Sequence, residues 1–246
     1  ERKTLDLSAT TEALQKIADD PQMRDANFTV VYNPEWHKGV VGIVASRLTE
    51  TYYRPTIVLT LSNGLITGSA RSVKDFDIYD AIDACSEHLE HFGGHKYAAG
   101  LSLKEENFEA FTKSFSEYVN AHITKEQLVP EIAIDSTIYL RDIGSKFFKI
   151  LRQFSPFGPG NLSPLFTTNG LVDTGKVRIV GKNHLKLEVV HPDISGFPFS
   201  AIAFQQGEHL DDIRNGKQFS ACYHIEENEW NGIKSIQLNI KDIKIE

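Results

Sequence analysis

Residues 93–100, Gly-Gly-His-Lys-Tyr-Ala-Ala-Gly, combine a versatile side chain with bare backbone. Gly93 and Gly94 can adopt backbone angles closed to other residues and expose their N–H groups to a ligand. His95 can donate to a phosphate, bind a metal ion or transfer a proton. Because a single histidine is more often structural than catalytic, this octapeptide needs support from other segments before it indicates an anion-binding or catalytic site.

Two further segments have residue types that suit an anionic ligand. Residues 36–42 lead into a predicted helix, whose free N–H groups would favour a negative charge. The alternative is an ordinary loop around a buried Trp36. In the predicted strand that ends at residues 68–72, Ser69 and Arg71 would face the same side and could bind one phosphate. The alternative there is a surface arginine in a turn. We interpret the three segments as one site, built from strand and helix ends.

The spacing of three histidines leaves a metal site as a second interpretation. His88, His91 and His95 are three and four residues apart. We favour a structural role for His88 and His91, since they fall in the last turns of a predicted helix, where the helix dipole stabilises histidine. The two glycines before His95 would take it off that helical face. No metal ligand is therefore assigned.

Apolar periodicity predicts the elements that would position these residues. The predicted helices cover residues 8–19, 39–53, 78–92 and 108–123, and the predicted strands cover residues 28–32, 56–61, 65–70 and 98–103. Asn63-Gly64 predicts a tight hairpin turn, and Gly93-Gly94 is expected to end the third helix. This alternation predicts an α/β domain with a central mixed sheet over residues 1–125.

After about residue 125 strand patterns dominate. The predicted strands cover residues 132–140, 185–189, 199–204 and 219–225, with a hairpin over residues 229–245 and one helix around residues 146–154. Asn231-Gly232 predicts a type I′ turn, and the slip in alternation between Ile240 and Ile243 predicts a β-bulge near residues 241–242. These short strands predict an all-β OB-fold barrel over residues 126–246.

The composition is that of a globular protein outside the membrane: 41% of residues are hydrophobic and 24% are charged. No apolar run approaches the roughly 20 residues of a membrane span, and no segment resembles a signal peptide. Cys85 and Cys222 match no zinc or redox spacing, so we interpret them as buried free thiols in a cytoplasmic protein. A net charge of −7 argues against a protein that simply coats nucleic acid.

Residues 141–186 carry a net positive charge, because they contain eight basic residues and only two acidic ones, Asp142 and Asp173. The segment could be a groove that follows a nucleic-acid backbone, or it could be a solvated helix face with strand ends. Five phenylalanines in the segment could stack on bases, although we expect most to lie in the core and one or two at most to touch DNA. The basic residues are Arg141, Lys146, Lys149, Arg152, Lys176, Arg178, Lys182 and Lys186, and the phenylalanines are Phe147, Phe148, Phe154, Phe157 and Phe166.

Five blocks of the sequence resemble, in order, the RecJ family of bacterial single-strand-specific 5′-to-3′ DNA exonucleases. The octapeptide is similar to the GGHxxAAG motif of the DHHA1 domain, which is the substrate-binding half of DHH phosphoesterases. The blocks are WHKGVVGIVASRL (36–48), GSARS (68–72), FGGHKYAAGLSL (92–103), FGPGNLSPLF (157–166) and VGKNHLKLEV (180–189).

The resemblance implies a DHHA1 domain followed by an OB-fold domain that binds single-stranded DNA, with residues 1–25 a leading helix or linker. In that family Mn²⁺ or Mg²⁺ is held by a separate N-terminal DHH domain, and this sequence has no Asp-His-His triplet. The first residue is Glu1 rather than methionine. We therefore expect the C-terminal portion of an enzyme, inactive as a nuclease alone and with no cofactor bound to this chain.

The resemblance also implies roles for individual residues. Ser69 and Arg71 would bind the terminal 5′-phosphate or a nearby phosphate. His95, presented by Gly93 and Gly94, would contact the scissile phosphate and offset developing charge. Weaker candidates for this cleft are His37 and Arg47, and the candidate DNA contacts of the second domain are Lys146, Lys149, Arg152, Phe157, Lys176, Arg178, Lys182 and Lys186.

Two other functions remain open. The chain could be half of a DHH-family phosphoesterase acting on oligonucleotides or nucleotides, or it could be a non-catalytic module that binds single strands or a protein. Relatives acting on short substrates usually stop after the DHHA1 domain, so the predicted barrel favours DNA. The expected partners are single-stranded DNA and the DHH domain of the same protein, with other repair proteins as further candidates and no membrane.

Overall fold

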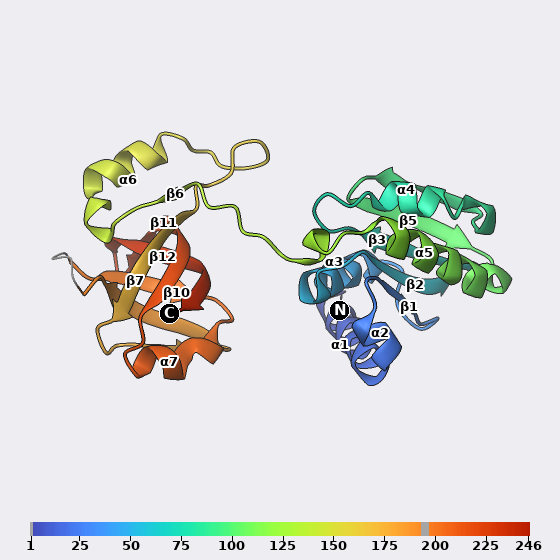
Figure 1. Ribbon diagram of the computed structural model, residues 1–246, viewed down its shortest axis with the longest axis horizontal. Helices are drawn as coiled ribbons and strands as arrows, with labels where there is room; N and C mark the ends of the chain where they lie inside the picture. Colours follow the sequence, from blue (N-terminus) through green and yellow to red (C-terminus); the bar gives the residue numbers. More distant parts are fainter. Residues whose placement is uncertain (1, 193–196) are drawn as a thin grey trace. The chain divides into compact units, whose positions relative to one another are not determined.

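The computed structural model describes residues 2–192 and 197–246, which leaves Glu1 outside the described residues. The chain divides into two compact units, Glu1–Glu131 and Ile132–Glu246 (Figure 1). In the described part of the chain, no helix has the length and apolar character needed to cross a membrane.

The first unit is built on a five-stranded mixed sheet in the order β1-β2-β3-β5-β4. β1 pairs with β2 in parallel and all other pairs are antiparallel. The strands are β1 (Thr29–Tyr32), β2 (Thr56–Ser62), β3 (Leu65–Arg71), β4 (His91–His95) and β5 (Ala98–Leu103). The α/β architecture with a mixed sheet is therefore confirmed.

Helices cover both faces of this sheet. The helices are α1 (Arg2–Asp19), α2 (Pro21–Asp25), α3 (Val41–Tyr52), α4 (Ile78–Asp83) and α5 (Phe108–His122), with 3₁₀ turns at Ser86–His88, Glu105–Asn107 and Glu126–Leu128. Leu48 of α3 and Ala13 of α1 share a buried cluster with Val58 of β2. Phe111 of α5 and Ile82 of α4 bury against the opposite face of the sheet. The sheet is therefore a middle layer with α1 and α3 on one side and α4 and α5 on the other.

The predicted helix over residues 78–92 is confirmed only over Ile78–Asp83 and is wrong beyond it. α4 ends at Asp83, a 3₁₀ turn follows, and β4 begins at His91 as an edge strand paired with β5. The strand forms because β5 offers backbone partners at each position, an interaction that the local sequence does not reveal. His88 therefore lies in the 3₁₀ turn and His91 in a strand, so the helix-dipole argument for these two histidines is also wrong.

The second unit is a seven-stranded sheet in the order β6-β7-β11-β12-β10-β9-β8. The strands are β6 (Ser136–Thr137), β7 (Phe166–Asp173), β8 (Arg178–Val180), β9 (His184–Val190), β10 (Phe199–Ala203), β11 (Phe219–Trp230) and β12 (Ile233–Ile245). β7 also pairs with β9 through Val172 and Asp173. Strands β7, β11, β12, β10 and β9 thereby form a closed circuit of pairing around one buried core, consistent with the predicted OB fold.

Two local predictions for the long β11–β12 hairpin are confirmed. Asn231 and Gly232 have positive φ angles of 51° and 78°, as a type I′ turn requires. Cys222 pairs with Asp242 while Tyr223 pairs with Ile240, so Lys241 is the extra residue of a β-bulge.

The predicted strand over residues 132–140 is wrong except at Ser136 and Thr137. Ile132 and Ile134 are nearly half exposed, so their alternation faces no core. The sequence reading also missed β7, β8 and one helix, while the helix predicted around residues 146–154 is confirmed. The helices are α6 (Ser145–Arg152) and α7 (Leu210–Arg214), with 3₁₀ turns at Leu140–Asp142 and Gly207–His209.

Candidate functional site

The register of three strands places four predicted site residues on one face of the first sheet. Ser69 of β3 pairs with Gly100 of β5, which pairs with Gly93 of β4. Arg71, two residues further along β3, pairs with Ala98 of β5, which in turn pairs with His95 of β4. Laterally paired residues point to the same face of a sheet. Ser69, Arg71, Gly93 and His95 therefore share one face.

The same register separates Gly94 from this set. Gly94 pairs with Ala99, which pairs with Ala70, and both alanines are buried in the core on the α4 and α5 side. A Cβ atom at Gly94 would lie 2.3 Å from the carbonyl oxygen of Ala98, whereas a Cβ at Gly93 would meet nothing within 4 Å. Gly94 is therefore required for packing, and Gly93 leaves the opposite face bare.

Helix α3 forms a wall along one side of this face. A Cβ at Gly42 would lie 3.3 Å from both Arg71 Nη2 and Ser69 Oγ, so the first turn of α3 closely approaches β3. Beyond β3, Gly100 and Gly93 are exposed, and the floor between α3 and the sheet edge is mainly backbone. A ligand can approach the strands closely there.

The guanidinium of Arg71 is held by several acceptors. Arg71 Nη1 donates to Ser69 Oγ at 2.9 Å and to the carbonyl oxygen of Ala70 at 2.8 Å, and Arg71 Nε donates to Ser46 Oγ at 3.2 Å. Among the described residues no carboxylate forms an ion pair with Arg71. The side chain is thus fixed in place while its positive charge is not neutralised by a direct partner, which suits an anionic ligand.

His95 is exposed on edge strand β4, beside the β4–β5 turn. Its Nδ1 atom accepts a hydrogen bond from the backbone N–H of Tyr97 at 3.2 Å. In a neutral ring this interaction leaves the proton on Nε2, which can donate to a ligand. The turn is fixed by hydrogen bonds from Ile78 N to Lys96 O and from Ser72 N to Tyr97 O, both 3.1 Å.

The two weaker candidates of the first unit lie in different surroundings. His37 is exposed and its Nδ1 accepts from the N–H of Gly39 at 2.9 Å, beside a hollow of about 550 Å³. Arg47 forms an ion pair with the buried Asp6 of α1, with 2.7 Å between Nη2 and Oδ2. Arg47 therefore ties α3 to α1.

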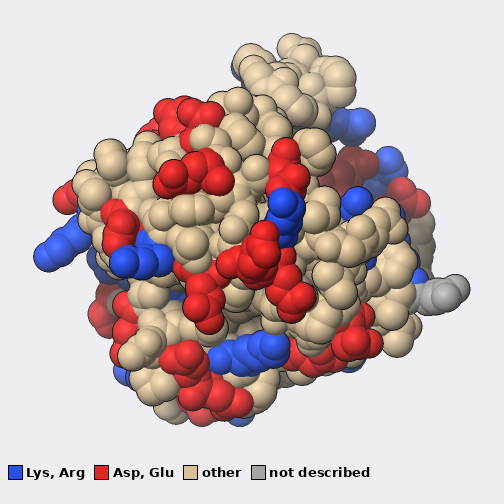
Figure 2. Space-filling model, turned by 90° about the vertical axis from the view of Figure 1, so that its right-hand side faces the viewer, with Lys and Arg blue, Asp and Glu red and all other residues tan. Residues whose placement is uncertain are grey.

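Charge distinguishes the two sides of the sheet. Helices α4 and α5 contain Asp80, Asp83, Glu109 and Glu117, against a single basic residue, Lys113. Acidic side chains also predominate on the face of the molecule in Figure 2. A polyanion is therefore disfavoured on the α4 and α5 side, opposite the face with Arg71 and His95.

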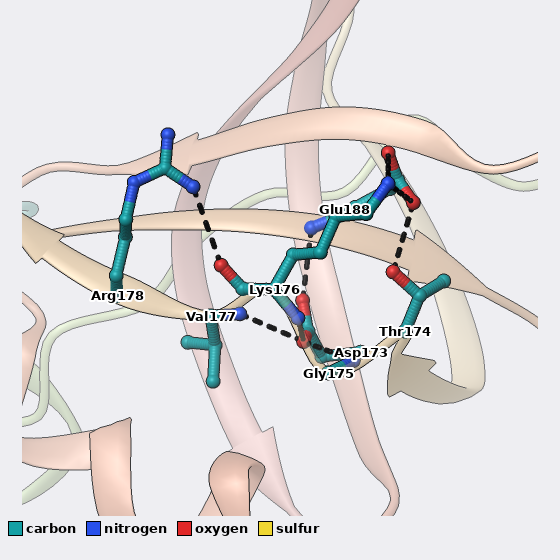
Figure 3. Close-up of polar contacts among 7 residues, drawn as sticks. All are labelled: Asp173, Thr174, Gly175, Lys176, Val177, Arg178 and Glu188. Atoms are coloured by element: carbon teal, nitrogen blue, oxygen red, sulfur yellow. Dashed lines mark hydrogen bonds and ion pairs between the residues drawn. The ribbon is translucent and has the colours of Figure 1, made fainter.

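The eight predicted DNA contacts of the second unit differ in their local charge. Arg152 is paired with Glu227 at 3.4 Å, and Lys176 is paired with Glu188 at 2.7 Å (Figure 3). Lys186 is half-buried, and its burial followed by the charge of Arg178 lowers the pKa of its ammonium group. The other seven candidates are exposed, and they are Lys146, Lys149, Arg152, Phe157, Lys176, Arg178 and Lys182.

The phenylalanines of the predicted basic segment are mostly part of the core. Phe166 is buried, and Phe147 and Phe148 are partly buried against the same cluster. Phe154 and Phe157 are 60% and 37% exposed, respectively. Phe154 lines an apolar groove of about 270 Å³ with Phe147, Ile150, Leu151, Pro164 and Phe166.

Sequence reasoning included Gly42 in the segment 36–42 but missed Ser46 as part of the site. Ser46 follows Gly42 by four residues, so both lie on one side of α3. The absence of a side chain at Gly42 and the hydroxyl group of Ser46 were the features from which the sequence could have indicated their roles. Their function depends on the packing of α3 against β3.

The described residues contain no group of three or more His, Cys, Asp or Glu side chains that could hold a metal ion. His88 instead contacts Ser114 Oγ, with 3.1 Å between that atom and Nε2. The donor set needed for a hydrolytic metal site is therefore not supplied by the described part of this chain.

Two domain families match the chain in succession. The DHHA1 domain family matches residues 25–121, and the RecJ OB domain family matches residues 134–242. The single-stranded-DNA-specific exonuclease RecJ of Bacillus subtilis is 32% identical over 248 residues, covering 100% of this chain and 31% of that protein. The Escherichia coli protein of the same name is 32% identical, with coverage of 98% and 43%.

A solved structure aligns with nearly the whole chain. The crystal structure of RecJ from Thermus thermophilus in complex with Mn²⁺ aligns with a TM-score of 0.80 and 27% identity, covering 99% of this chain and 34% of that one. The chain therefore spans between 31% and 43% of the length of these relatives.

Proposed function

We propose that this chain is the DNA-binding part of a single-strand-specific 5′-to-3′ exonuclease. The proposal is supported by the successive matches to the DHHA1 and RecJ OB domain families and by the similarity to the C-terminal region of RecJ. The observation that carries this proposal is the shared face of β3 and β4, where Arg71 and His95 flank a floor of exposed glycine backbone. Such a face can bind a phosphodiester backbone closely.

Within this proposal, Arg71 and His95 bind different phosphates. β3 and β4 are separated by β5, so their backbones lie roughly 10 Å apart. We assign Arg71 and Ser69 to the terminal 5′-phosphate, because the guanidinium is held ready to donate to phosphate oxygens. We assign His95 to the neighbouring scissile phosphate, where a proton on Nε2 would offset the charge that develops during hydrolysis. Gly93 would keep the path between them open.

The cleavage chemistry would require groups that this chain does not supply. We propose that Mn²⁺ or Mg²⁺ is held by an N-terminal DHH domain of the same protein, since the described residues here form no suitable ligand set. The RecJ structures of Thermus thermophilus were solved in complex with Mg²⁺ and with Mn²⁺. This chain would contribute binding, orientation and a hydrogen-bond donor.

Reconstitution tests the enzyme assignment. The chain alone should not degrade single-stranded DNA in the presence of Mn²⁺, whereas adding a DHH domain of the same protein should restore degradation of 5′-phosphorylated single strands. Cleavage by the chain alone that survives repurification would contradict the proposal. Persistent inactivity of the mixture, with DNA binding retained, would favour a non-catalytic binding module.

Removal of the second unit tests the substrate. If the substrate is DNA, a chain ending at Glu131 should lose most of its affinity for a long single strand. If the substrate is a short oligonucleotide or a nucleotide, affinity for a dinucleotide should persist in the shortened chain. Circular dichroism of the shortened chain provides the folding control.

We also propose a cytoplasmic location and contacts with other repair proteins. The location is supported by Cys85 and Cys222, which are both free and buried rather than joined in a disulfide.

A further inference from the structure

Two basic side chains of the second unit face each other without a counter-ion. Arg178 of β8 pairs directly with Lys186 of β9, so both side chains lie on one face of the sheet. Among the described residues, neither forms an ion pair with a carboxylate. Like charges at directly opposite positions destabilise a strand pair. A bound anion would remove that cost.

The loop before β8 positions Arg178. One carboxylate, that of Asp173, accepts four backbone hydrogen bonds at 2.6 to 2.9 Å. Arg178 Nη1 donates to the carbonyl oxygen of Lys176 at 3.4 Å (Figure 3). The backbone donors to Asp173 are Gly175, Lys176, Val177 and Glu188. Arg178 therefore extends from a tightly ordered loop.

The acidic residue nearest to Lys186 along the same strand face is already engaged. Glu188 accepts from Lys176 Nζ at 2.7 and 2.9 Å and from Thr174 Oγ1 at 2.8 Å (Figure 3). Lys176 is therefore neutralised by Glu188, whereas Arg178 and Lys186 keep their charges. The burial of Lys186 and its proximity to Arg178 lower the pKa of the Lys186 ammonium group, and an anion between them would oppose this shift.

We propose that Arg178 and Lys186 form a clamp for one backbone phosphate of single-stranded DNA, and that Lys176 takes no part in it. This inference rests on the proposed function of the chain. Arg178 supplies a planar fork of donors and Lys186 a compact charge, a combination that suits a tetrahedral phosphate. Local charge neutralisation would thus separate true DNA contacts from basic residues that only stabilise the fold.

The salt dependence of DNA binding tests the clamp. The probe is a fluorescein-labelled oligothymidylate bound by the complete 246-residue chain, with affinity measured over a range of NaCl concentrations. Each lost phosphate contact should reduce the slope of log K against log salt by about 0.7 for a single strand. Arg178→Met and Lys186→Met should each show this reduction, Lys186→Arg should retain the wild-type slope, and Lys176→Met should leave it unchanged.

A substitution that gains function provides a second readout. Glu188→Gln should release Lys176 and steepen the slope by about 0.7, and adding Lys176→Met should cancel the gain. Unchanged slopes in Arg178→Met and Lys186→Met, with normal binding by the wild-type chain, would overturn the clamp but not the proposed function. If the wild-type chain fails to bind at low salt, both are wrong.

Discussion

The guanidinium of Arg71 and the hydroxyl of Ser69 are hydrogen-bonded to each other, with 2.9 Å between Arg71 Nη1 and Ser69 Oγ. The two residues alternate along β3, and Ser46 of α3 fixes the guanidinium from the other side. Because these contacts hold the side chain before any ligand arrives, less conformational entropy is lost when a phosphate binds. Arg71 is therefore a preorganised cation beside a floor of exposed glycine backbone.

Arg71→Ala should weaken binding of 5′-phosphorylated single strands by about 10- to 100-fold, because hydrogen bonds to charged groups contribute about 1.5–3 kcal/mol. Binding of the same strand with a 5′-hydroxyl should change little. Fluorescence anisotropy with the two labelled strands measures the difference. Arg47→Ala is the matched control: it removes the ion pair with Asp6 and should lower thermal stability instead of phosphate dependence.

His95→Ala should lower turnover of the reconstituted enzyme by about 100-fold with little change in KM, because its hydrogen bond would strengthen only as charge develops. Steady-state kinetics on a 5′-phosphorylated oligonucleotide measure both constants. His91→Ala is the control, since His91 lies on the same face of β4, two residues before Gly93. Equal losses in the two variants would contradict a specific role for His95.

Gly94→Ala should destabilise the first unit by about 2–3 kcal/mol, because the new Cβ would overlap the backbone of β5. Gly93→Ala should leave the fold intact, since its Cβ meets open space, but it should weaken DNA binding by obstructing the floor of the proposed site. Urea unfolding and DNA binding of both variants test this division. A stable Gly94→Ala variant would contradict the described β4–β5 register.

Alkaline pH should destabilise the first unit through Cys85. Burial, followed by the charge of Glu87, raises the pKa of this thiol from 9.0 to about 11. The folded state then holds its proton more tightly than the unfolded state, so the free energy of unfolding is unaffected below pH 9 and falls as pH rises towards 11. The expected loss is about 2–3 kcal/mol.

Urea unfolding at about pH 8 and about pH 11, on either side of the thiol titration, measures this loss, and Cys85→Ala provides the reference. Burial also raises the pKa of Tyr223 in the second unit, to about 12, so this residue likewise lowers stability at alkaline pH. Tyr223 is present in both the wild type and Cys85→Ala. The difference between wild type and Cys85→Ala therefore isolates the thiol. A wild-type chain that loses no more stability than Cys85→Ala between the two pH values would refute the assignment.

Local sequence was sufficient for much of the fold. Asn63-Gly64 and Asn231-Gly232 indicated their turns because few other residues tolerate two successive positive φ angles. Strict alternation around Leu238, and its slip before Ile243, indicated both a strand and its bulge, since each residue of a strand must face either core or solvent. The octapeptide at residues 93–100 and two other segments together suggested an anion-binding site, which stays a prediction.

Tertiary structure decided what local sequence could not. Residues 91–95 form a strand because β5 supplies their backbone partners, although a helix was expected through residue 92. That pairing puts Gly93 and His95 on the face of Arg71 and leaves no space for a side chain between Gly94 and the backbone of β5. The ion pairing of basic side chains was likewise decided by the tertiary structure. Lys176 and Lys186 are equivalent in the sequence, but of the two only Lys176 meets a carboxylate among the described residues. Strand register and ion pairing depend on residues that meet only when the chain is folded.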